Sequence, residues 1–102
     1  MMKSFGDMMK QAQKVQKQMG ELQEKLADER FEATSGGGLV HVVVDGKQML
    51  REIKLSPELL KDNDVTVIED LVLTAVGEAQ RASSEKMSEA YAKLTGGFKL
   101  PI

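Results

Sequence analysis

A row of lysines near the N-terminus recurs at intervals typical of one side of an α-helix. Its members are Lys3, Lys10, Lys14 and Lys17. On a helical wheel at about 100° per residue, they fall within roughly 60° of one another. Lys10, Lys14 and Lys17 would span about 10 Å along the axis, a distance that can match successive phosphates of a duplex. The chemistry that this pattern supports is electrostatic contact with a polyanion. Gln11, Gln13 and Gln18 flank the row and can donate hydrogen bonds to phosphates or sugars.

An ordinary solvated helix face is the alternative interpretation of the lysine row. The net charge is −2, from 14 basic and 16 acidic residues, whereas DNA-binding proteins are usually basic overall. The charge is unevenly distributed, however. The first 20 residues hold the four lysines and one acidic residue, Asp7, which leaves a local charge of +3, whereas residues 21–30 carry −2. Because a ligand that meets one end of the molecule responds to the local field, this end can still attract a polyanion.

The opposite side of the same predicted helix carries an apolar seam with the alternating spacing of a coiled coil. Its members are Met8, Ala12, Val15, Met19, Leu22 and Leu26. The helix is expected from Ser4 to Asp28, with Ser4 or Asp7 as its N-cap. Its length from Phe5 to Leu26 would be about 33 Å, more than the core of 102 residues can cover. We therefore expect part of this helix to project, with the apolar seam seeking a partner and the lysines facing away from it.

Three segments predict a small antiparallel sheet because they are rich in β-branched residues or alternate in polarity. They are residues 30–34, 39–44 and 47–55. Asp45-Gly46, between the last two segments, predicts a two-residue type I′ turn, which requires positive φ at both positions. Val40, Val42 and Val44 would share one face of the sheet.

Two helices are expected after the sheet. A serine, proline and glutamate at 56–58 mark the start of a short helix at 57–61. Thr66 and Glu69 have the spacing of a capping box and predict a second long helix, residues 67–94. Its apolar edge would include Ala82. These elements predict an α+β fold in one domain that spans residues 1–102, with a thin core that favours self-association.

No constellation for catalysis or for a cofactor is evident. The chain has no cysteine, and His41 is its only histidine, so a zinc site is not expected. The glycines at 36–38 lack the following Lys-Ser or Lys-Thr of a phosphate-binding loop, and no nucleophile has a recognisable base. No apolar run approaches the roughly 20 residues that span a membrane, and a signal peptide is not recognisable. We expect a non-enzymatic cytoplasmic protein with no cofactor, no membrane association and no small-molecule substrate.

The order of these segments resembles the YbaB/EbfC family of bacterial nucleoid-associated proteins. The similarity covers nearly the whole chain and is carried by MMKQAQKVQKQM, SGGGLVHVVVDG, IKLSPELL, EDLVLTAVGEA and GGFKLPI. It implies a homodimer, joined largely through its sheets, whose long helices project like the arms of tweezers. It also implies binding of double-stranded DNA in the nucleoid with little sequence preference. The expected DNA-binding residues are Lys3, Lys10, Gln11, Lys14 and Lys17, with Lys86 and Lys99 as further contributors.

A function of a different class also fits the sequence. Amphipathic helical arms with exposed methionines could grip apolar segments, as in a protein-binding adaptor or holdase. Salt separates the two functions, because DNA binding weakens steeply as salt rises and apolar gripping does not.

Overall fold

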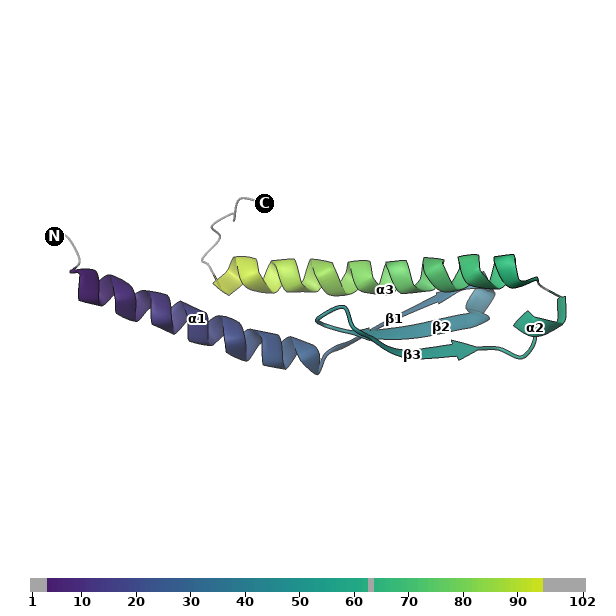
Figure 1. Ribbon diagram of the computed structural model, residues 1–102, viewed down its shortest axis with the longest axis horizontal. Coiled ribbons are helices and arrows are strands. Elements are labelled where there is room, and N and C mark those ends of the chain that lie inside the picture. Colours follow the sequence, from purple (N-terminus) through teal and green to yellow (C-terminus); the bar gives the residue numbers. More distant parts are fainter. Residues whose placement is uncertain (1–3, 63, 95–102) are drawn as a thin grey trace.

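One long helix lies along a three-stranded sheet, and a second long helix projects away from the sheet, in an elongated molecule of 71 × 23 × 17 Å (Figure 1). The computed structural model describes residues 4–62 and 64–94. In chain order its elements are α1 (Phe5–Ala27), β1 (Arg30–Ser35), the 3₁₀ helix η1 (Gly36–Gly38), β2 (Val40–Asp45), β3 (Leu50–Leu55), α2 (Leu59–Asp62) and α3 (Val65–Leu94). The expected α+β fold class and the order of its elements are therefore confirmed.

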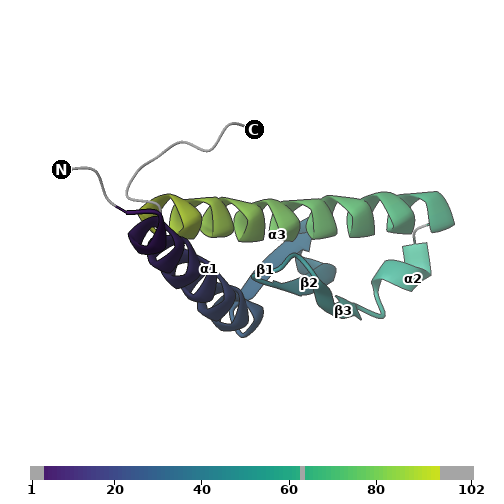
Figure 2. The same ribbon diagram turned by 60° about the vertical axis from the view of Figure 1, so that its left-hand side comes forward.

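The core lies between the sheet and α3. The sheet is antiparallel with the order β1-β2-β3, and α3 runs along one face of it, where it packs on β1 and β2 (Figures 1 and 2). Alternate valines of β2 point to this face, as the two-residue period of a strand requires. The fully buried residues of the core cluster are Val40, Val42, Val44, Leu59, Ala75 and Ala79.

Strand β3 forms an edge of the sheet and is exposed along its whole length. Ile53 pairs with Val42 and Leu55 pairs with Val40, so both side chains share the face that α3 covers over β1 and β2. They nevertheless remain 43% and 42% exposed. The sheet therefore ends in an apolar strip that residues 4–62 and 64–94 leave uncovered.

The connection between β2 and β3 differs from the predicted two-residue turn. Strand β3 begins at Leu50, so residues 46–49 join the strands, and positive φ occurs at Gln48 rather than at Gly46. Gly46 has a different role, because its amide donates to the carbonyl oxygen of Leu26 at 2.9 Å. A Cβ at Gly46 would overlap that oxygen. Glycine is thus needed for close approach to the end of α1, and the type I′ prediction was wrong.

The cap of α3 also differs from the prediction. The helix begins at Val65, and the carboxylate of Asp64 accepts the amide of Val67 at 2.9 Å. Asp64 therefore satisfies a free N–H of the first turn, which the prediction had assigned to Thr66. The cap of α1 is as expected, because the Ser4 hydroxyl accepts the amide of Asp7 at 3.2 Å.

Candidate nucleic-acid interface

Helix α1 leaves the sheet and projects beyond the end of α3 (Figure 1). Residues 5–17 are all exposed, and burial begins at Gln18 and becomes almost complete at Leu26. We call residues 5–17 the α1 arm. At 1.5 Å per residue the arm is about 20 Å long. Because neither the sheet nor α3 covers it, both its lysine row and its apolar seam face solvent.

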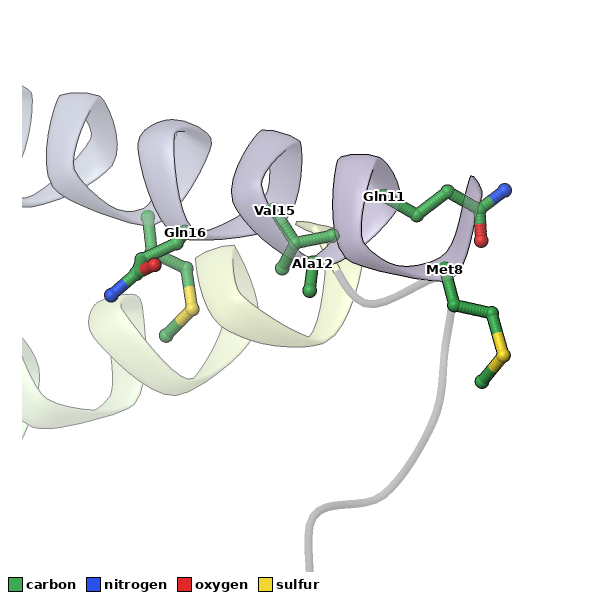
Figure 3. A pocket seen from close by; sticks show the side chains of 6 residues that line it. Met8, Gln11, Ala12, Val15 and Gln16 are labelled. Carbon is green, nitrogen blue, oxygen red and sulfur yellow. The ribbon is translucent and has the colours of Figure 1, made fainter. Parts of the chain in front are cut away.

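The lysine row occupies the side of the α1 arm opposite the apolar seam. Lys10, Lys14 and Lys17 are all exposed, and within the described residues none of them takes part in an ion pair. Gln11 is exposed as well, but it lies beside the seam rather than within the row (Figure 3). Lys3 and Lys99 lie outside the described residues. The structure thus brings three of the expected cations together on one accessible surface.

Acidic residues limit this cationic surface towards the root of the helix. Glu21 and Glu24 are exposed and follow Lys17 by one and two helical turns on the same side of α1. Their charges oppose any anion that approaches the root. The excess of positive charge therefore lies on the outer part of α1, away from the sheet, where Lys10, Lys14 and Lys17 outnumber the single acidic residue Asp7.

Lys86 lies in a separate place, in a crevice between α3 and the root of α1. The crevice has a volume of about 150 Å³, and it also contains Lys25, Lys93, Glu29 and Glu89. Three cations therefore meet two carboxylates there, and Lys86 does not extend the lysine row. Lys25 and Lys93 were missed as neighbours of Lys86, because sequence periodicity cannot show which parts of two distant helices will lie side by side.

The apolar seam of α1 forms an open groove of about 490 Å³ that runs along the arm and ends at Met19, two residues beyond it. Its walls are Met8, Gln11, Ala12, Val15, Gln16 and Met19 (Figure 3). Met8 is 58% exposed and Val15 is 39% exposed, which is unusual for apolar side chains arranged in a continuous stripe. This side of the arm is therefore suited to an apolar partner.

A buried carboxylate organises the root of the arm. Asp45 is fully buried. One of its carboxylate oxygens accepts hydrogen bonds from the main-chain amides of Lys47 and Met49 at 2.8 and 3.0 Å. Its other oxygen accepts a hydrogen bond from Nε–H of Arg51 at 2.8 Å and lies 2.8 Å from Nη2 of the same guanidinium in an ion pair. Arg51 can reach it because a β-bulge makes Arg51 the extra residue of β3. Burial raises the pKa of Asp45, but these hydrogen bonds outweigh burial and leave the pKa below its ordinary value.

Main-chain groups next to this carboxylate tie three elements together. The hydroxyl of Ser83, buried on α3, donates to the carbonyl oxygen of Asp45 at 2.8 Å. The amide of the neighbouring Gly46 donates to the carbonyl oxygen of Leu26 of α1. The prediction had placed Ala82 on the inner edge of α3, but Ala82 is exposed and Ser83 takes that position. The direction of the α1 arm is therefore set where α1, the hairpin and α3 meet.

Other kinds of site find no support in the part of the chain that the structure describes. No three histidine, cysteine, aspartate or glutamate side chains gather there as metal ligands would. His41 lies on the sheet with its Nε2 3.5 Å from a carboxylate oxygen of Glu32. None of the helices in residues 4–62 and 64–94 combines the length and the apolarity that crossing a membrane requires.

Comparison with known proteins agrees with an interface for nucleic acid on this fold. The model of the YbaB/EbfC DNA-binding family matches residues 2–98. The chain belongs to this family. A nucleoid-associated protein from Clostridium kluyveri is 43% identical to this family member over 98 residues, which cover 96% of this chain and 86% of that protein. A nucleoid-associated protein from Caldanaerobacter subterraneus is 42% identical over 98 residues, with 96% and 88% covered.

The fold also has a counterpart among solved structures. The crystal structure of the uncharacterized protein HP0035 from Helicobacter pylori matches this family member with a TM-score of 0.85 at 21% sequence identity. The match covers 92% of this chain and 99% of that chain. The two proteins therefore share a fold.

Proposed function

We propose that this protein binds double-stranded DNA through the lysine row of its α1 arm and acts in nucleoid organisation or gene regulation. The observation that carries the proposal is the exposure of Lys10, Lys14 and Lys17 on one side of a projecting helix, with no described ion pair to neutralise them. Membership of a DNA-binding family and the names of the relatives support the same ligand. The proposed role is non-enzymatic and needs no cofactor.

The contacts of the arm would go to phosphates rather than to bases. Ammonium groups on flexible stems act as point charges and make no planar pair of hydrogen bonds to a base edge. Gln11 can add a hydrogen bond to a phosphate or sugar from the flank of the row. Binding would therefore depend little on sequence and would be driven by counterion release. Lys3, Lys86 and Lys99 are secondary candidates for the same role.

The acting species would be a homodimer joined through the sheet. Strand β3 has an edge that pairs with no other strand among the described residues, and Leu50, Ile53 and Leu55 on it are each more than 40% exposed. A second copy of β3 could pair with this edge and cover the apolar strip in a symmetric interface. Two arms would then present two lysine rows to one duplex, which strengthens binding through multivalency.

A binding titration tests the proposal with matched variants. The arm variant carries Lys10→Gln, Lys14→Gln and Lys17→Gln, and the control variant carries Lys47→Gln, Lys61→Gln and Arg81→Gln, which are exposed positions outside α1. Both lose three positive charges. On a random-sequence duplex, measured by fluorescence anisotropy, the arm variant should bind at least about tenfold more weakly than the control variant. Equal affinities of the two variants would refute the assigned surface.

The open groove on the other side of the arm favours a second candidate function. A protein-binding adaptor or holdase would use Met8, Val15 and Met19 to hold an apolar segment of another protein. Its binding would persist or strengthen as salt rises, and the arm variant would retain it. Repeating the titration at two salt concentrations, with an unfolded apolar protein in place of DNA, distinguishes this function from DNA binding.

A further inference from the structure

The apolar groove on the α1 arm runs from Met19 near the root to Met8 near the tip. The side chains of Met8, Ala12 and Val15 project from the same side of the helix (Figure 3). No residue that lines the groove is charged. Its occupant should therefore be an apolar segment narrow enough to lie along a single helix face.

The end of α3 lies at the root of this groove. Ala90, Lys93 and Leu94 of α3 form a second crevice with Gln18 and Leu22 of α1. Gln18 is adjacent in sequence to Met19, which lines the groove on the arm. The side chain of Gln23 also donates to the hydroxyl of Tyr91 at 3.1 Å, which fixes the two helices together here. The chain therefore leaves α3 beside the inner end of the groove.

The residues that follow α3 are long enough to reach the tip of the arm. Residues 95–102 follow Leu94, and eight extended residues span up to about 26 Å. The distance along α1 from Met19 to Met8 is about 17 Å at 1.5 Å per residue. The segment is therefore long enough to cover the whole groove.

The sequence of this segment has the chemistry that the groove requires. Phe98, Leu100 and Ile102 alternate with Lys99 and Pro101, so an extended segment would carry three apolar side chains on one side. A proline disfavours the helical conformation of the residue before it, which favours extension. The two glycines that precede Phe98 tolerate the change of direction that a helix end demands.

We propose that residues 98–102 of this chain dock in extended conformation along the apolar groove of its own α1 arm. Phe98, Leu100 and Ile102 fill the groove and cover Met8 and Val15, while Lys99 points away from it. The docking closes the apolar side of the arm against other segments and leaves the lysine row exposed. It requires no DNA, so it can be tested apart from the proposed function.

Disulfide trapping in the full chain tests the docking, because the protein has no cysteine of its own. The test variant carries Val15→Cys and Leu100→Cys, and the matched control carries Lys17→Cys and Leu100→Cys. Lys17 lies close to Val15 in sequence but on the opposite side of α1, and it is adjacent to Gln18, which shares a crevice with the end of α3. With diamide as oxidant, the test variant should form an intrachain disulfide at least about tenfold faster than the control. Equal rates would overturn the proposal, and so would a disulfide that forms mainly between chains, which would make a second copy the occupant.

Methyl NMR of the methionines gives an independent readout without engineered thiols. Replacing Phe98→Ser and Leu100→Ser should shift the methyl signals of Met8 and Met19. Met49, which is 59% exposed in the connection between β2 and β3, should be unaffected. Unchanged Met8 and Met19 signals would show that the groove is open in the wild-type protein and would overturn the proposal.

Discussion

Replacing Asp45 with asparagine removes the charge that three hydrogen-bond donors and the guanidinium of Arg51 surround at the root of α1. The amide oxygen of asparagine can still accept the main-chain N–H groups of Lys47 and Met49, but its NH₂ group would then face the guanidinium of Arg51. Hydrogen bonds to charged groups contribute about 1.5–3 kcal/mol each. Because the side chain of Arg51 is 49% exposed and can turn towards water, part of this loss is recovered. We expect the free energy of unfolding to fall by about 2–3 kcal/mol at neutral pH.

The loss should depend on pH in a defined direction. Burial raises the pKa of Asp45, but the hydrogen bonds from the amides of Met49 and Lys47 and from the side chain of Arg51 lower it by more than burial raises it. The native pKa therefore lies below the ordinary value of about 3.9. Between these two pKa values the unfolded chain binds more protons than the native state, so stability falls as the pH falls. The contribution of Asp45 is thus fully present above its unfolded pKa and is lost as the pH drops through its native pKa. The difference between wild type and Asp45→Asn should shrink over that range.

Urea unfolding followed by far-UV circular dichroism measures both effects. The protein concentration is kept constant, because self-association would make the apparent stability depend on it. Glu52→Gln is the matched control, since Glu52 undergoes the same chemical change on the neighbouring strand β3 but forms an exposed ion pair with Lys54. Such pairs are worth about 0–1 kcal/mol. A loss for Asp45→Asn no larger than that for Glu52→Gln, or a loss that stays constant as the pH falls, would refute the role given to Asp45.

Three further substitutions test other parts of the structure. Gly46→Ala should lower stability by about 1–3 kcal/mol, seen as a lower Tm, because its Cβ would overlap the carbonyl oxygen of Leu26; an unchanged Tm would contradict this close approach. Ser83→Ala should cost about 1 kcal/mol in urea unfolding by removing the hydrogen bond to the carbonyl oxygen of Asp45, and no loss would argue against that bond. Ile53→Glu should convert the proposed homodimer to a monomer in sedimentation equilibrium, because it puts a charge on the apolar strip of β3; a dimer of unchanged affinity would exclude this strand from the interface.

Features of the fold that depend on local periodicity could be predicted from the sequence. The apolar seam of α1 repeats over six positions, and alternating valines on β2 define a buried face, so both elements were evident without tertiary information. The hairpin was harder, since Asp45-Gly46 has the composition of a tight turn. Its glycine is needed against Leu26, which lies 20 residues earlier in the chain. A contact of this kind between distant segments leaves no local pattern.

The candidate site likewise has some features that local spacing predicts and others that depend on contacts between distant segments. The lysine row lies on one helix, so spacing alone placed Lys10, Lys14 and Lys17 on a common side. The surroundings of Lys86 depend on how α3 crosses the root of α1, and the sequence contains no periodic signal for that crossing. Ser83 was overlooked for a related reason, because a buried serine is recognisable only when its acceptor is known.

The salt dependence of DNA binding tests the lysine row of the α1 arm most directly. Each phosphate neutralised by a lysine contributes about 0.9 to the slope of log affinity against log salt. Removing Lys10, Lys14 and Lys17 should therefore reduce the magnitude of the slope by roughly 2.7 for each arm that contacts the duplex, and the control variant at Lys47, Lys61 and Arg81 should keep the wild-type slope. A slope for the arm variant equal to that of the wild type, or an equal reduction in the control variant, would contradict contact through the arm.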